Sequence, residues 1–152
     1  MNNEEQFKKY INLFLMAILS FVSMFILMYI MVDSYSNVYV NFNQFYMAGI
    51  MTIPMVIIEL FLMRSMYTNK KLNTLIVVGS LVIFMVLIFF VRKQTGISDK
   101  QFLKSMIPHH AAAILMCNKA QLQDPEIKAL CKNIGSNQQS EIDFMKSKLE
   151  SI

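Results

Sequence analysis

The stretch Ser105-Met-Ile-Pro-His-His-Ala-Ala-Ala-Ile-Leu-Met-Cys117 holds both histidines of the chain, one of its two cysteines and two of its 14 methionines. If the stretch forms a helix, Met106, His110 and Cys117 lie on one stripe, because spacings of four and seven residues return to the same face. Imidazole, thioether and thiolate groups are ligands for soft and borderline metal ions. The stretch therefore predicts a helix that carries a candidate metal site.

The residues around the histidines indicate where this helix begins and where it bends. Ser98 followed by Gln101 three residues later is a capping-box pattern, which is typical of a helix start. Pro108 lies inside the helix and cannot donate a backbone hydrogen bond to the carbonyl of Lys104. We therefore expect a bend just before the two histidines and a free carbonyl group near the candidate site.

A second helix is predicted to begin at Asp124, with Pro125 at the first helical position and Glu126 in the first turn. The short link between the two helices favours an antiparallel hairpin over residues 98–152. Its second helix has a mostly apolar stripe at helical spacing. This stripe consists of Ile127, Leu130, Cys131, Ile134, Gln138, Ile142, Met145 and Leu149.

The hairpin sets the chemically interesting residues of its two helices opposite each other in one seam. Pairing about a turn near Asp124 places Cys117 opposite Cys131, His110 opposite Gln138, and Met106 near Ile142, Glu141 and Met145. His110 and Cys117 are seven residues apart on the first helix, as are Cys131 and Gln138 on the second. This heptad spacing keeps all four residues in the same seam.

Three interpretations of this seam stay open. A metal site would combine thiolate, thioether and imidazole ligands, which select Cu(I) and also suit zinc, with Glu141 orienting a histidine through its other ring nitrogen. A disulfide between Cys117 and Cys131 would need an oxidising compartment and Cα atoms within about 7 Å. Plain core packing would use cysteine and methionine as adaptable apolar groups.

The two adjacent histidines are not expected to bind one ion, because they point about 100° apart on a helix. His109 shares a second stripe with Met116, seven residues away, which would serve a second site or a partner chain. Nucleophilic catalysis is not predicted, since His110 and Cys117 are about 10 Å apart along the helix, too far for direct activation. We therefore predict that the protein is not an enzyme.

The composition places the rest of the chain in a membrane. The 152 residues are 55% hydrophobic and only 16% charged, and the apolar residues concentrate before residue 92. Three apolar runs, 11–32, 45–63 and 72–91, are long enough to cross a bilayer core of about 30 Å. We therefore predict an all-α protein with a three-helix transmembrane region at 1–93 and the helical hairpin at 98–152.

Basic residues indicate the orientation of these spans. Lys8 and Lys9 precede the first span, three further basic residues lie between the second and third, and the loop 33–44 has no Lys or Arg. By the positive-inside rule, the N-terminus is cytoplasmic and the hairpin is extracytoplasmic. The formal charge of +4 therefore reflects membrane topology, and no nucleic-acid partner is expected.

The hairpin also resembles a known family in its motifs. Asp99-x-x-Phe102-x-x-x-Met106-Ile-Pro-His-His110-x-x-Ala113-Ile114-x-Met116, followed by Gln138-x-x-Glu141-Ile142-x-x-Met145, is similar to domain of unknown function 305. The membrane half resembles a subgroup with three crossings. The resemblance implies a ferritin-like fold and copper binding in a bacterial envelope. Carried over by position, the metal-linked residues are Met106, His109, His110, Met116, Gln138, Glu141 and Met145, whereas Cys117 and Cys131 rest on the seam geometry alone.

The patterns predict a membrane-anchored metal-binding protein with its C-terminal domain outside the cytoplasm. The resemblance implies in addition that the metal is copper, that the membrane is a bacterial inner (cell) membrane, and that the role is copper handling or resistance. The protein's partners would be the lipid bilayer, a metal ion and further copies of itself. Because one hairpin buries little surface, a homodimer or higher homo-oligomer that completes a four-helix bundle is expected. The alternative is a structural membrane protein whose hairpin assembles without metal.

Overall fold

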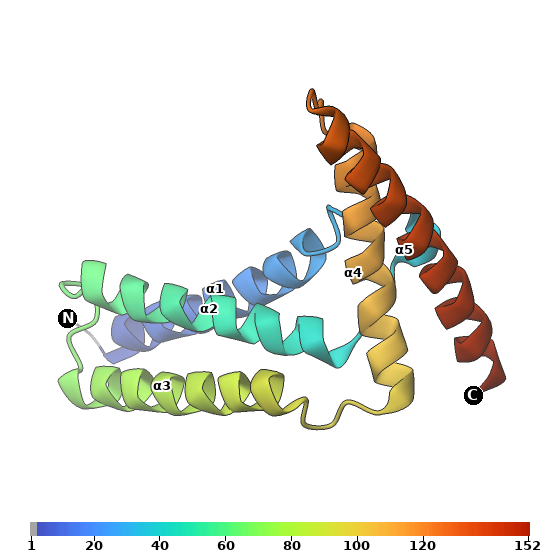
Figure 1. The fold of residues 1–152 in the computed structure, drawn as a ribbon. Helices are drawn as coiled ribbons and strands as arrows, with labels where there is room; N and C mark the ends of the chain where they lie inside the picture. Colours follow the sequence, from blue (N-terminus) through green and yellow to red (C-terminus); the bar gives the residue numbers. More distant parts are fainter. Residues whose placement is uncertain (1–2) are drawn as a thin grey trace. The chain divides into compact units, whose positions relative to one another are not determined.

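A computed structural model describes residues 3–152, and these residues form five α-helices and one short 3₁₀ turn, without any strand (Figure 1). The prediction of an all-α fold is therefore confirmed. In chain order the elements are α1 (Asn3–Leu27), η1 (Tyr35–Asn37), α2 (Phe42–Leu62), α3 (Lys70–Lys93), α4 (Asp99–Lys119) and α5 (Pro125–Ser151).

Three helices are long and apolar enough to cross a membrane, as the composition predicts: Glu4–Leu27, Phe42–Leu62 and Lys70–Lys93. The first boundary differs from the expected one, because α1 ends at Leu27 and not at residue 32. The apolar character of the next residues has another cause. Val32 packs against the core of the hairpin, so its apolar side chain serves a protein interior.

The residues cluster into two compact units, the first of which contains α1 and Phe45–Thr95. Leu13 of α1 and Val56 and Leu60 of α2 form its buried core together with Tyr67. Polar bonds close one end of this unit, where Asn69 caps α3 by accepting a hydrogen bond from the backbone N–H of Leu72 at 3.1 Å. The three apolar helices are therefore packed together and capped within one unit.

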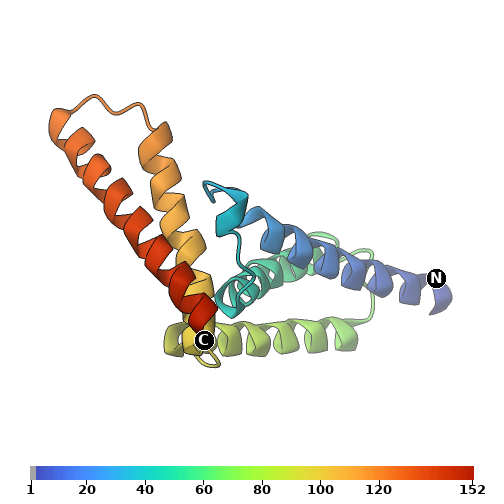
Figure 2. The ribbon, with the colours of Figure 1, turned by 90° about the vertical axis from the view of Figure 1, so that its right-hand side faces the viewer.

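The second unit consists of Met28–Gln44 and Gly96–Ile152, so the loop that follows α1 folds together with the hairpin. Figure 2 shows α4 and α5 as an antiparallel pair joined by a short loop at one end. Their shared core consists of Leu103, Ile107, Ala111, Ile114, Ile142 and Met145. Val32 and Tyr39 of the loop pack against this core, so the loop covers part of the hairpin's apolar surface.

Asn41 joins this loop to α4 one turn before Pro108. Its side chain is 2% exposed and donates to the backbone carbonyl of Lys104 at 3.4 Å. This is the carbonyl that lacks a helical partner because Pro108 has no N–H. The Asn41 side chain also accepts from the backbone N–H of Gln44 at 3.0 Å, which caps the start of α2. One buried amide therefore serves two backbone groups that would otherwise have no partner.

Tyr29 fixes the other end of the loop. Its hydroxyl donates to the carbonyl of Tyr39 at 2.9 Å. Burial of the phenol raises the pKa of Tyr29 from about 10 to about 12, because a charged phenolate would lose hydration there. The loop is therefore held by buried polar bonds as well as by apolar packing.

Candidate functional site

His110 lies between the two helices of the hairpin and has a partner on each side of its ring. Its residue is 8% exposed. The Nδ1 atom lies 2.9 Å from the backbone carbonyl oxygen of Met106, and the Nε2 atom lies 2.6 Å from Oε2 of Glu141. The Glu141 side chain is 57% exposed, so the pair connects the interior of the hairpin to solvent.

The two partners of His110 determine where its protons lie. A carbonyl oxygen can only accept, so Nδ1 must carry a proton. Nε2 and the Glu141 carboxyl group share a second proton, either as imidazolium with carboxylate or as neutral imidazole with carboxylic acid. In both cases the Met106 carbonyl keeps a proton on Nδ1, and Nε2 is the atom that faces the exposed Glu141 side chain.

Two thioethers and one amide flank this pair. Met106 lies one helical turn before His110 on α4 and packs against the hairpin core. Met145 lies one turn after Glu141 on α5 and is 7% exposed in the same core. Gln138 is half-buried and lies about one turn before Glu141. The structure therefore brings His110 and Glu141 into contact and packs Met106 and Met145 in the same hairpin core, while Gln138 is placed near Glu141 only by its position on α5.

His109 and Met116 lie apart from this group. Both residues are exposed, Met116 at 51%, as expected for a second stripe on α4. The ring centroids of His109 and His110 are 6.0 Å apart, and the rings are tilted by 63°. The two histidines therefore present their nitrogens in different directions, as their adjacent positions on a helix predict.

Cys117 and Cys131 form a disulfide, with Cα atoms 5.3 Å apart. This corrects their assignment as metal ligands, because a cysteine binds metal as a thiolate and a disulfide sulfur carries no such charge. The disulfide does match the predicted register, in which the two cysteines face each other across the seam. The second of the three open interpretations therefore holds for this pair.

One pairing in the predicted register is different. His110 was expected opposite Gln138, but it bonds to Glu141, three residues further along α5. An ionisable partner provides a stronger, charge-assisted bond than an amide does, and both positions lie on the same side of the helix. The contact expected between the Glu141 carboxylate and a histidine ring nitrogen is present, and the Met106 carbonyl holds the second ring nitrogen of His110. A histidine four residues after a helical carbonyl is the sequence signal for that contact.

Among residues 3–152, no three side chains of His, Cys, Asp or Glu lie together as a metal-binding group. The donors that the seam offers are instead one imidazole, one carboxylate, one amide and two thioethers. A thioether-rich donor set of this kind fits a soft ion.

The fold and the site together define an all-helical protein in which three helices can cross a membrane and a disulfide-linked hairpin holds a buried histidine–carboxylate pair. A family model described as Domain of unknown function (DUF305) matches residues 89–151. An uncharacterized protein of Acanthamoeba polyphaga mimivirus is 34% identical over 139 residues, which cover 90% of each chain. The chain therefore belongs to the DUF305 family, as its motifs predict.

The viral relative is similar along both the apolar helices and the hairpin, because the match covers 90% of the chain. Since this relative comes from a virus, it does not support the bacterial origin that the resemblance implied. No solved structure matches the chain.

Proposed function

We propose that the protein is a membrane-anchored metal-binding protein whose extracytoplasmic hairpin holds Cu(I), for copper handling or resistance. The observation that supports this proposal most is the pair of contacts made by His110. Metal-binding histidines commonly donate their second ring N–H to a carboxylate or backbone carbonyl, which fixes the tautomer. Here the Met106 carbonyl holds Nδ1, and Nε2 remains as the atom that would bind the ion.

Binding at Nε2 would displace the proton that His110 shares with Glu141. The imidazole would keep its Nδ1 proton on the Met106 carbonyl and turn its Nε2 lone pair toward the ion. Glu141 would keep a negative charge beside the bound cation, which offsets part of the cost of holding a cation in the seam. Because one proton leaves, binding should weaken as the pH falls.

The thioethers favour Cu(I) over zinc. Met106 and Met145 are soft ligands that lie one turn from His110 and Glu141, respectively. Structural zinc sites use thiolate, imidazole and carboxylate ligands, and the disulfide removes both thiolates from this chain. His109 and Met116 would form a separate outward site or act through a partner chain.

Two features support an extracytoplasmic hairpin. The loop before α2 has no Lys or Arg and folds into the same unit as the hairpin, so both lie on one side of the membrane. By the positive-inside rule that side is not the cytoplasm. A disulfide within this unit fits an oxidising compartment.

The test is metal loading of the full chain in detergent. Wild type and His110→Ala, Met145→Leu and His109→Ala variants are loaded with Cu(I) under ascorbate, desalted and assayed for copper per chain. We expect a stoichiometric loading that His110→Ala abolishes and Met145→Leu weakens, whereas His109→Ala reports the outward stripe separately. Negligible loading that is equal in wild type and His110→Ala would overturn the proposal and favour the structural alternative.

A further inference from the structure

The two faces of the hairpin differ in what covers them. The loop lies against one face, where Asn41 donates to the Lys104 carbonyl at 3.4 Å and Lys146 donates to the Ser36 hydroxyl at 3.5 Å. Because Lys104 lies on α4 and Lys146 on α5, the loop reaches both helices. Glu141 meets His110 on the other face, which lies away from the contacts that Asn41 and Ser36 make with the hairpin.

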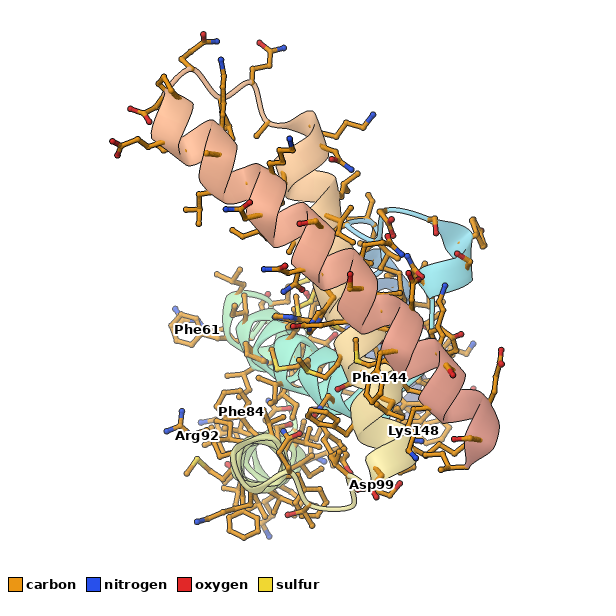
Figure 3. All side chains as sticks on the ribbon, turned by 45° about the vertical axis from the view of Figure 1, so that its right-hand side comes forward. Phe61, Phe84, Arg92, Asp99, Phe144 and Lys148 are labelled. Carbon is orange, nitrogen blue, oxygen red and sulfur yellow. A yellow bond between two sulfur atoms is a disulfide. The ribbon has the colours of Figure 1, made fainter. Side chains whose placement is uncertain are left out.

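Large apolar side chains occupy this second face. On α4, Phe102 and Met116 are 50% and 51% exposed, and on α5, Leu130 and Phe144 are 57% and 67% exposed. Figure 3 marks Phe144 and Lys148 on α5. A soluble surface rarely exposes so many large apolar groups together unless something binds there.

The spacing of these residues is that of helices that pack against other helices. Phe102, His109 and Met116 are each seven residues apart on α4, and Leu130, Asn137 and Phe144 are each seven residues apart on α5. A heptad spacing keeps a stripe directed at a neighbouring helix along its whole length. The face therefore carries two parallel heptad stripes, which is the pattern that a second pair of helices would fit.

We propose that this face binds the same face of a second copy of the chain, so that two hairpins form a four-helix bundle. A face of two helices, about 30 Å long over the 21 residues of α4 and about 20 Å wide, covers about 600 Å². Standard interfaces bury about 600 to 1,000 Å² on each partner, so the face lies at the lower end of the size that a dimer needs.

A second copy fits this face better than lipid does. Glu141 lies in the middle of the face and is paired with His110, and a carboxylate is costly against hydrocarbon. Between two hairpins, a carboxylate from one copy and a histidine from the other are complementary under a two-fold axis. Copies held in one bilayer also share an orientation and a high local concentration, which favours such an interface.

The dimer would change the surroundings of the histidines. The Glu141 side chain, now 57% exposed, would be covered, and His109 would lie inside the interface and not in solvent. In this arrangement His109, which lies between Phe102 and Met116 in the α4 stripe, would face the second copy. The interface itself does not depend on bound metal, so its test is separate from copper loading.

Photo-crosslinking in membranes tests the proposal with a closely matched control. Phe144 and Val40 are both 67% exposed, but Val40 belongs to the loop that covers the opposite face. Each is replaced in turn by p-benzoylphenylalanine in the full chain, and membranes are irradiated without added metal. We expect a product of twice the 17.6 kDa chain from position 144 and none from position 40.

A second variant checks that the product reflects this face. Adding Leu130→Glu to the position-144 chain should lower the dimer yield at least tenfold, while adding Val40→Glu should leave it unchanged. Circular dichroism of both variants verifies that the helices are intact. The proposal is overturned if position 144 crosslinks only to lipid or to other proteins, if both positions crosslink equally, or if Leu130→Glu leaves the yield unchanged.

Discussion

Replacing Asn41 by alanine should destabilise the second unit by about 2 kcal/mol, and the structure divides this loss into two parts. Loss of the cap on α2 costs about 1 kcal/mol. Loss of the donor to the Lys104 carbonyl leaves that carbonyl without a partner, which costs about 1 to 3 kcal/mol. The lower figure of about 1 kcal/mol applies, because the donor–acceptor distance of 3.4 Å is long for a hydrogen bond.

The carbonyl of Tyr39, which also accepts from Asn41 at 2.9 Å, does not add to this loss. It keeps the hydroxyl of Tyr29 as a second donor at 2.9 Å. The part of the loss that depends on Lys104 can therefore be isolated with one further substitution. Pro108→Ala restores a backbone N–H that can reach the Lys104 carbonyl within the helix.

A double-mutant cycle measures this dependence. In the Pro108→Ala background, Asn41→Ala should cost only about 1 kcal/mol, which leaves a coupling free energy of about 1 kcal/mol between the two sites. Chemical unfolding in detergent, followed by circular dichroism, gives the free energies, and hydrogen exchange of peptides from α4 shows where protection is lost. If Asn41→Ala costs the same in both backgrounds, Asn41 does not serve the carbonyl that Pro108 leaves free.

Three further predictions follow from single contacts. Replacing Cys117 and Cys131 by serine should lower the free energy of unfolding by about 3 kcal/mol, because the disulfide closes a loop of about 15 residues. Unfolding of the wild type with and without a phosphine reductant checks this. An unfolding midpoint that the reductant leaves unchanged would contradict it. The raised pKa of Tyr29 should make the second unit lose stability as the pH rises from 10 toward 12, because the unfolded state releases the phenolic proton first. Unfolding of Tyr29→Phe should lack this alkaline dependence. If the variant keeps it, Tyr29 is not the group that causes the loss of stability. Gly49→Ala should cost about 1 kcal/mol in thermal unfolding, because a Cβ would lie 2.7 Å from the flexible end of Leu87, and a stabilised variant would count against this packing.

The sequence predicts the helices of this protein well because each carries a local signal. The cap of α4 is an example, since the Ser98 side chain accepts from the backbone N–H of Gln101 as its capping-box pattern predicts. Asp124 caps α5 in the same way, with Pro125 at its first position. The register between the two helices also follows from the sequence, because the short link fixes which residues face each other, as the Cys117–Cys131 bond shows.

The loop before α2 could not be predicted in this way, because its structure depends on contacts far away in the chain. Val32 ends a continuous apolar run, and only the hairpin core that it contacts explains why it lies outside the first helix. Asn41 is buried because a proline more than sixty residues later frees a carbonyl. Neither residue carries a local pattern that reveals its partner.

The sequence predicts which residues lie in the seam, but it does not predict the contacts that they make. Spacing brings Met106, His110, Glu141 and Met145 to one part of the seam, and the structure agrees. Spacing does not decide between thiols and a disulfide, since both need facing cysteines. It also does not decide which of two residues on one side of α5 meets His110, because a shift of one helical turn leaves the stripe unchanged.

X-ray absorption at the copper edge tests the central proposal most directly. The full chain is loaded with Cu(I), and the nearest neighbours of the metal are identified in wild type and in His110→Ala. We expect one imidazole nitrogen together with sulfur neighbours in wild type, and loss of the imidazole signal in the variant. A spectrum with only oxygen or nitrogen neighbours, or one that His110→Ala leaves unchanged, would show that copper does not bind at the histidine that Met106 orients.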